Sequence, residues 1–382
     1  MKLSSADQSA VGPNVLLVSS QCPTRAHAGG LRVLDIYRLL QTKGQFGRID
    51  LFTIKNPKVD WSYEMLPDIF DTVYFAQSDD LSPAALATVG GQADLYDVID
   101  FQFPQQAENI AAFQETGAFT LYTPMELLSR SYDMRPFLRK LTKNARKYRA
   151  VASKEIDICR MVDRVVCVSE PDANHLRHHH GLTSVTSLET CVSDIEFPSD
   201  LKLEVSPTQD VIFIAFFDSR TNQKALLWYL KEVHEKVRAQ VPHYRLMVVG
   251  RGDLDSFRSF EDDSVLLIGE VDALADALAK AAVGIAPALG GAGIRGKLHQ
   301  YAMANVPMVA SPIAASSMSY QDGRDLLVAK SPKDFAAQVI KLLSDQELRR
   351  TMASNANTHC RAKYTWDTKA EQVVGLYQIQ PI

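Results

Sequence analysis

The chain has 382 residues, of which 46% are hydrophobic and 23% charged, and its formal net charge at pH 7 is −4. This length favours two domains with cores of ordinary size, and the slightly acidic balance gives no case for a protein that binds nucleic acid over its whole surface. The five cysteines are an odd number without a C-x-x-C pair, which argues against a disulfide framework and a thiolate metal site and predicts a cytoplasmic protein.

The N-terminal segment MKLSSADQSAVGPN is polar and lacks the apolar core of a signal peptide. No later segment reaches the roughly 18 consecutive apolar residues that a membrane-spanning helix needs. We therefore expect a protein that is neither exported nor integral to a membrane.

Short apolar segments rich in Val, Ile, Phe and Tyr alternate with helical patterns from Asn14 to about Thr190. The predicted strands are NVLLVSS, RIDLFTI, TVYFA, YDVIDFQF, AFTLYTP and DRVVCVS. Nearly continuous apolar strands are typical of a parallel sheet that helices cover on both faces. Residues 1–192 are therefore predicted to form a doubly wound, Rossmann-like α/β domain.

Residues 193–210 carry two prolines and no sustained period, which predicts a linker. The alternation then resumes with DVIFIAFF, YRLMVVG, SVLLIGEV, VGIAP, PMVAS and DLLVAK, so residues 211–364 are predicted to form a second Rossmann-like domain. The tail is helical, and we expect the segment 365–382 to pack back across both domains. Two such sheets facing a cleft would direct the carboxyl ends of their strands at one ligand, and a nucleotide-linked substrate fits that place.

The segment GGAGIRGKLHQYAMANVPMVAS combines a glycine turn, two cations and a predicted helix start. Gly291 and Gly293 permit close approach of the backbone to a ligand, and the helix is predicted to begin near Ile294. Arg295 and Lys297 would lie in or just before the first helical turn, where a bound phosphate offsets their unfavourable position relative to the helix dipole. The alternative is a solvated Arg and Lys beside a connecting loop, because the spacing is neither a Walker loop nor a dinucleotide fingerprint.

This segment resembles the G-x-G-x-R-x-K-x-x-E-A-x-A-x-G-x-P-V-V motif of the retaining GT-B glycosyltransferases of family four. VPHYRLMVVGRG and LLIGEVDALADALAKAAVGIAP before it, and DGRDLLVAKSPKDFAAQVIKLLSD and YTWDTKAEQVVGLY after it, are similar to the same family in the same order. The resemblance covers roughly residues 211–377, and GGLRVLDIYRLLQTKG in the first half fits the family more weakly. It implies two Rossmann-like domains, with a nucleotide diphosphate sugar held by the second and with Arg295 and Lys297 near its phosphates.

The resemblance also implies further donor contacts at strand ends and helix starts. They are Gly29, Gly30, Arg220, Lys224, Gly250, Arg251, Gly269, Glu270, Val271, Gly291, Gly293 and Ile294. For each glycine turn the alternative is a turn that serves the shape of the chain alone.

The chain departs from the family pattern where the family carries acids. Gln300 and Ala292 stand where the family has its two glutamates, and Asn305 stands where it has a glycine. Gln300 can still exchange a hydrogen bond with a ribose hydroxyl, but it holds no negative charge. In the first domain, Thr123 aligns near the family's histidine, which leaves Glu126 as the matching acid and as a candidate catalytic residue with Arg295 and Lys297.

A different feature is the segment 135–154, which carries eight cations and no acid. As a helix it would be basic and amphipathic, and such a helix binds anionic membranes or lipid-linked diphosphates. The alternative is a solvated helix on a globular surface. Binding of RNA is not expected, because the segment lacks aromatic interleaving.

The sequence thus predicts a glycosyltransferase that moves a sugar from a nucleotide diphosphate sugar to a hydroxyl of a glycan, a glycolipid or a similar acceptor. We expect retention of configuration from the resemblance, and metal-independent chemistry because no D-x-D-like site follows a strand; no cofactor is expected besides the donor substrate. The expected location is the cytoplasm, with peripheral attachment to the inner face of the membrane. The alternatives are a non-catalytic binding or scaffold protein with this fold and a GT-B sugar-nucleotide epimerase, and the base and sugar of the donor stay open.

Overall fold

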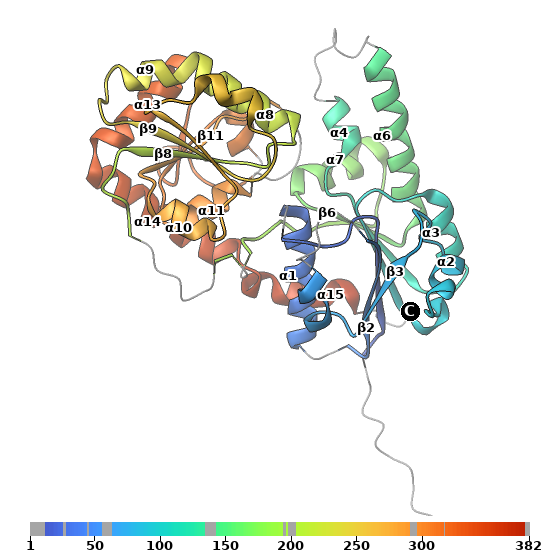
Figure 1. The fold of residues 1–382 in the computed structure, drawn as a ribbon. Coiled ribbons are helices and arrows are strands. Elements are labelled where there is room, and N and C mark those ends of the chain that lie inside the picture. The colour runs from blue at the N-terminus through green and yellow to red at the C-terminus, as the bar shows by residue number, and fades with distance from the viewer. Residues whose placement is uncertain are drawn as a thin grey trace, which may run out of the picture. The chain divides into compact units, whose positions relative to one another are not determined.

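The computed structural model divides the chain into two compact units (Figure 1). The first consists of Met1–Leu188 with Ala370–Ile382, and the second of Glu189–Lys369. The structure describes residues 12–25, 28–43, 46–55, 63–133, 143–193, 196–197, 204–290, 296–316 and 318–378. Each unit holds one sheet whose strands are all parallel.

The sheet of the first unit has seven strands in the order β3-β2-β1-β4-β5-β6-β7. They are β1 (Val15–Ser19), β2 (Ile49–Ile54), β3 (Thr72–Ala76), β4 (Val98–Gln102), β5 (Phe119–Thr123), β6 (Arg164–Cys167) and β7 (Val185–Ser187). Every residue of β1 is buried, and β1 pairs with β2 on one side and β4 on the other. The strand order reverses at β1 and β4, which is the place where doubly wound sheets open a crevice at their carboxyl edge.

Helices connect these strands and one further helix joins them from the C-terminus. They are α1 (Ala28–Lys43), η1 (Tyr63–Asp68), α2 (Pro83–Thr88), η2 (Ala93–Leu95), α3 (Ala107–Gln114), α4 (Leu128–Asp133), α6 (Lys143–Met161), α7 (Glu170–His180) and α15 (Ala370–Tyr377). The helix α15 packs on α1, and the Tyr377 hydroxyl donates to the carboxylate of Asp100 in β4 at 2.7 Å. Tyr37 of α1 donates to the same carboxylate at 2.8 Å, so one buried acid joins three elements of this unit.

The sheet of the second unit has six strands in the order β10-β9-β8-β11-β12-β13. They are β8 (Asp210–Ile214), β9 (Arg245–Val249), β10 (Val265–Gly269), β11 (Val283–Ala286), β12 (Met308–Ala310) and β13 (Leu327–Val328). Its helical elements are α8 (Arg220–Tyr229), η3 (Leu230–His234), α9 (Glu235–Arg238), η4 (Asp255–Phe260), α10 (Leu274–Ala279), α11 (Lys297–Met303), α12 (Pro312–Ala315), α13 (Pro332–Ser344), α14 (Gln346–Lys363) and η5 (Asp367–Lys369). Here the order reverses at β8 and β11.

Alternate residues of β8 face two separate hydrophobic cores. Val211 and Phe213 pack with α8, α9 and α13, whereas Ile212 and Ile214 pack with α11 and α14. The sheet is therefore covered on both faces, as its continuous apolar strands predict.

The sequence predicts almost every strand of both sheets. All six predicted strands of the first half and all six of the second are present. It misses β7, an edge strand of three residues with the polar sequence VTS, because β7 lacks the apolar run that identifies the others.

Candidate functional site

Three loops at the carboxyl edge of the second sheet are joined to one another through backbone hydrogen bonds. They follow β8, β9 and β10, the strands on one side of the reversal. The amide of Phe217 donates to the carbonyl of Arg251 at 2.7 Å, and that of Gly250 donates to the carbonyl of Gly269 at 2.7 Å. These loops therefore form one continuous backbone surface at the place where such sheets bind ligands.

Two glycines make this close approach of the loops possible. Gly250 has φ of +136°, and a Cβ atom there would lie 1.9 Å from the carbonyl oxygen of Ala215. Gly252 has φ of +114°, and its Cβ would lie 2.6 Å from the amide nitrogen of Asp218. Backbone conformation and lack of space both exclude a side chain at these positions. The two glycines are therefore required for the close contact between the loops.

Two of the charged residues on these loops, Arg251 and Glu270, are among the donor contacts that the sequence predicts. The Arg251 Nε atom lies 4.0 Å from a carboxylate oxygen of Glu270, which is an exposed residue. The Nη1 atom of Arg251 is buried and has no hydrogen-bond partner among the residues that the structure describes. Gly269, with φ of +76°, and half-buried Val271 border the same loop.

The predicted basic pair of α8 lies at the start of that helix, after the loop that follows β8. Arg220 is the first residue of α8 and Lys224 lies one turn later, and both side chains are exposed. They share the edge of the sheet with the three joined loops. No contact of either side chain with those loops is described.

The helix α11 is held against the sheet by Tyr301. Its hydroxyl oxygen accepts from the amide of Ile214 at 3.2 Å and lies 3.0 Å from the carbonyl oxygen of Ile285. Gly284 leaves room for the ring, since a Cβ there would lie 2.6 Å from it. The fifth residue of α11 is thereby fixed over β8 and β11, the two strands at the reversal.

Lys297 is the first residue of α11, and its ammonium group lies 4.2 Å from the centre of the Phe213 ring. The side chain therefore lies over Phe213, the fourth residue of the five-residue strand β8. Gly291, Gly293, Ile294 and Arg295 belong to the segment 291–295, which lies outside the described residues. The helix as described begins at Lys297.

Gln300 has a partner that sequence reasoning misses. Its Nε2 atom donates to the Oε2 atom of Glu196 at 2.9 Å, across 104 positions of sequence. Both residues are half-buried. A carboxylate is thus present beside Gln300, where the family pattern has a glutamate. A different segment of the chain supplies it.

In the first unit, the predicted glycine loop lies at the start of α1. A Cβ on Gly30 would lie 2.2 Å from the carbonyl oxygen of Thr24, so the chain between β1 and α1 folds back tightly there. Gly29 precedes it and is half-buried.

The two N-terminal positions that the resemblance singles out have different surroundings. Thr123 ends β5, is buried, and accepts a hydrogen bond from Gln102 at 3.1 Å. Glu126 follows the strand, is exposed, and accepts a hydrogen bond from the Ser131 hydroxyl at 2.9 Å. Of the two, Glu126 is therefore the one that a substrate could reach.

A buried acid, Glu155 of α6, lies close to this loop and is missed by sequence reasoning. Its carboxylate accepts from the amide of Leu128 at the start of α4, at 2.9 Å. Burial raises the pKa of Glu155 to about 7, and the nearby charges of Glu126 and Asp172 act in the same direction.

The first eight positions of the predicted basic segment, 135–142, lie outside the described residues. The remainder belongs to α6, where Arg146, Lys147, Arg149 and Lys154 are exposed. Val151 stands among them with an exposed fraction of 53%. This part of the segment is a helix with a basic surface, as predicted.

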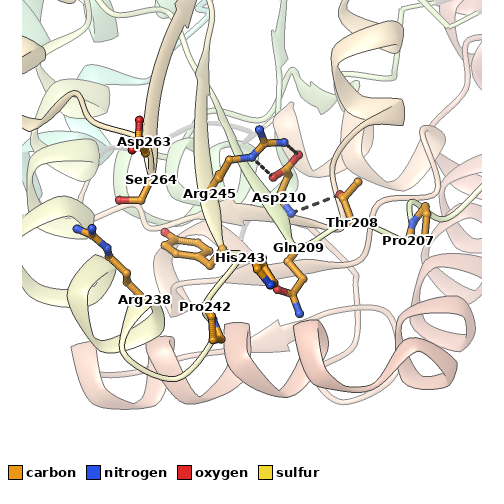
Figure 2. A pocket seen from close by; sticks show the side chains of 11 residues that line it. Pro207, Thr208, Gln209, Asp210, Arg238, Pro242, His243, Arg245, Asp263 and Ser264 are labelled. Atoms are coloured by element: carbon orange, nitrogen blue, oxygen red, sulfur yellow. Dashed lines mark hydrogen bonds and ion pairs between the residues drawn. The ribbon is translucent and has the colours of Figure 1, made fainter.

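A hollow of about 670 Å³ lies at the opposite edge of the second sheet (Figure 2). Residues at or just before the starts of β8, β9 and β10 line it, among them Asp210, Arg245 and Ser264. The guanidinium of Arg245 binds both carboxylate oxygens of Asp210, at 2.6 and 2.7 Å. The hollow therefore lies at the amino ends of these strands, at the edge opposite to Gly250, Arg251, Gly269 and Glu270.

Two negative findings hold for the described residues. They contain no group of three or more His, Cys, Asp or Glu side chains placed to hold a metal ion. Within the same ranges, no helix has the length and apolar character needed to span a bilayer.

Comparison with known proteins finds a family match for part of the second unit. Residues 208–345 match the sequence model of the family described as Glycosyl transferases group 1. A phosphatidyl-myo-inositol mannosyltransferase of Mycolicibacterium smegmatis (strain ATCC 700084 / mc(2)155) is 29% identical over 176 residues, and that match covers 44% of this chain and 44% of the mannosyltransferase. The chain thus spans less than half the length of this curated relative.

Solved structures share the fold over nearly the whole chain. Anabaena Alr3699/HepE in complex with UDP and glucose has a TM-score of 0.71 at 13% identity, with 95% of this chain and 99% of that chain covered. Sucrose-phosphate synthase from Thermosynechococcus elongatus has a TM-score of 0.68 at 17% identity, with 95% and 98% covered. WaaG, a glycosyltransferase involved in lipopolysaccharide biosynthesis, has a TM-score of 0.66 at 13% identity, with 94% and 100% covered. Residues 208–345 are thus similar in sequence to the glycosyl transferases of group 1, and the whole chain shares the two-sheet fold of these solved structures.

Proposed function

We propose that the protein transfers a sugar from a nucleotide diphosphate sugar to a hydroxyl group of a glycan or of a lipid-linked acceptor. The observation that carries this proposal is the carboxyl edge of the second sheet, where three loops are joined by backbone hydrogen bonds and the Lys297 ammonium group lies over the Phe213 ring of β8. The UDP and glucose of the HepE complex, and the lipid in the name of the mannosyltransferase, support the same classes of donor and acceptor.

The residues of this edge have separate roles in the proposal. We assign the backbone at Gly250 and Gly269 to the base and ribose, since these two residues present no side chain of their own to a ligand. Lys297 neutralises the diphosphate together with Arg295. The buried Nη1 atom of Arg251 gains a hydrogen-bond acceptor from the donor, which removes the cost of leaving that polar group unpaired.

In the reaction, the bond between the anomeric carbon and the diphosphate oxygen breaks, and a bond from the acceptor oxygen to that carbon forms. The acceptor loses its proton, and the nucleoside diphosphate leaves with the bonding electrons. Lys297 and Arg295 stabilise the negative charge that develops on the leaving group, and this electrostatic contribution is the basis for proposing metal-independent chemistry. Retention of configuration is proposed from the resemblance to family four, and Glu126 is proposed to act on the acceptor side.

Binding of the donor is tested first, by thermal unfolding of the purified protein with UDP, GDP, ADP, CMP and dTDP. A ligand at about 100 times its Kd adds about 2.7 kcal/mol to the folded state, which corresponds to an increase in Tm of roughly 5–10 °C for a unit of this size. The sugar nucleotides of the base that binds are then incubated with and without glycan and lipid acceptors. Transfer to an acceptor supports the proposal.

The same assays separate the alternatives. Binding without any turnover identifies a binding or scaffold protein, and isomerisation of the donor without an acceptor identifies an epimerase. If none of the nucleotides changes the Tm, the proposed donor site is wrong.

Lys297→Met tests the phosphate contact, because it keeps an apolar stem against Phe213 and removes the charge. We expect the Kd of the nucleoside diphosphate to rise about tenfold to a hundredfold, as for a lost charged hydrogen bond. Lys341→Met is the control, since Lys341 is an exposed lysine in the last turn of α13. Equal Kd values for the two variants would contradict the role of Lys297.

We further propose that the basic surface of α6 binds anionic membranes and keeps the protein at the inner face of the membrane. Each Lys or Arg near an anionic surface contributes about 1 kcal/mol, so replacing Arg146, Lys147 and Arg149 with Gln should weaken binding to phosphatidylglycerol vesicles about a hundredfold. Vesicles of phosphatidylcholine should bind neither protein. The control replaces three exposed cations of the second unit with Gln: Lys236, Arg258 and Arg350. An equal loss in the control would show that only net charge matters.

A further inference from the structure

The contact between Glu196 and Gln300 joins two segments that are far apart in sequence. Gln300 lies in α11, and Glu196 lies in the stretch of chain between β7 and β8. The amide of Gln300 donates to the Glu196 carboxylate at 2.9 Å. An amide that donates to a carboxylate fixes the position of that group and adds no charge of its own.

The position of this pair relates it to the donor edge. Gln300 follows Lys297 by three residues, so the two side chains lie on neighbouring positions of the same helical surface. Leu298 and Tyr301 are turned into the core and fix that orientation. The Glu196 carboxylate is therefore near the residue that we assign to the diphosphate.

The chemistry of a donor determines what a carboxylate can do there. On either side of the diphosphate, a nucleotide sugar presents hydroxyl groups, on the ribose at one end and on the transferred sugar at the other. A carboxylate is an acceptor with two oxygens, and it binds a pair of neighbouring hydroxyls as an amide alone cannot.

We propose that Glu196 binds a pair of neighbouring hydroxyls of the donor and that Gln300 positions it. This proposal rests on the proposed function. It assigns a binding role to Glu196, a residue that lies outside the strands and helices of both units. Gln300 is not itself an acid in this proposal, and its role is to position the acid Glu196.

The test measures Kd values of UDP, 2′-deoxy-UDP, 3′-deoxy-UDP and UDP-glucose for the wild-type protein and for Glu196→Gln. Loss of a charged hydrogen bond should raise the Kd about tenfold to a hundredfold. If the ribose is the partner, Glu196→Gln weakens UDP but leaves the binding of at least one deoxy nucleotide almost unchanged. If the transferred sugar is the partner, Glu196→Gln weakens UDP-glucose and leaves UDP unchanged.

Two further variants complete the test. The exchange Glu196→Gln with Gln300→Glu keeps one carboxylate and one amide in the pair, and it should restore binding to within a few-fold of the wild type. Glu204→Gln, at an exposed position of the same stretch, should have no effect.

Some outcomes would overturn the proposal. They are unchanged Kd values in Glu196→Gln, and an equal loss for all four ligands, which would indicate a purely structural contact. If the wild-type protein binds no nucleoside diphosphate, the proposed function fails together with this inference. If it binds one and Glu196→Gln binds it equally well, only this inference fails.

Discussion

Gly250→Ala is the substitution that most directly tests the joined loops of the second unit. Two features exclude a side chain at Gly250. Its φ is +136°, and the carbonyl oxygen of Ala215 lies 1.9 Å from the position that a Cβ atom would occupy. An ordinary contact of this kind is longer than 3.4 Å. Alanine therefore cannot fit unless the backbone of one of the two loops moves.

The expected cost follows from these two features. A side chain in a rarely allowed backbone conformation costs about 1–3 kcal/mol. Movement of the loops also weakens the hydrogen bonds of Gly250 to Gly269 and of Ala215 to Val249, each of which contributes about 1 kcal/mol. The sum is about 3–5 kcal/mol, which lowers the Tm of a unit of this size by roughly 10 °C or more.

Gly269→Ala is the matched control, because Gly269 lies on the same edge with φ of +76° but has open space around its Cβ. The free energy of unfolding of Gly269→Ala should fall only by the cost of the backbone conformation, about 1–3 kcal/mol. Urea unfolding of both variants measures the difference, and nucleotide binding shows whether the edge keeps its shape. Equal stability of the two variants would refute the claim that the contact between Gly250 and Ala215 holds the loops together.

Two predictions concern the first unit. Tyr377→Phe removes one of the hydroxyls that bind the buried Asp100 carboxylate, and we expect a loss of about 1–3 kcal/mol in urea unfolding; an unchanged unfolding curve would mean that α15 is held by packing alone. Glu155→Gln should change how stability depends on pH. Because the pKa of Glu155 is raised from 4.5 to about 7 on folding, its stabilising effect is complete below pH 4.5 and is lost as the pH rises through 7. Between pH 4 and pH 8, the free energy of unfolding of the wild type should therefore fall by about 3 kcal/mol more than that of Glu155→Gln. If urea unfolding gives the same dependence of this free energy on pH for both proteins, the role of Glu155 is contradicted.

The sequence predicts the fold well because most of its strands are buried on both faces. A strand such as β1, with no exposed residue, must be apolar throughout, and that run is visible without any partner. β7 is different, because it pairs on one side only and its two polar residues carry no such signal.

The site is predicted less completely, because its geometry depends on contacts between distant parts of the chain. The glycines at the ends of β9 and β10 can be found by their position after apolar strands. That Gly250 meets Ala215, 35 positions earlier, cannot be found in this way, because nothing in the local sequence of either loop indicates its neighbour. The same holds for Glu155, whose burial against α4 depends on how two helices pack.

Glu196 is the residue that sequence reasoning had the least chance of finding. It lies in a stretch without periodicity, and the pattern at Gln300 indicates only that an acid is absent from the helix. The electrostatics of α11 explain why the acid is nevertheless useful nearby. Lys297 puts a positive charge at the positive end of the helix dipole, and no acid lies in the first turn of α11. Gln300 holds the Glu196 carboxylate beside this helix, so the negative charge that the helix itself lacks is supplied by another segment.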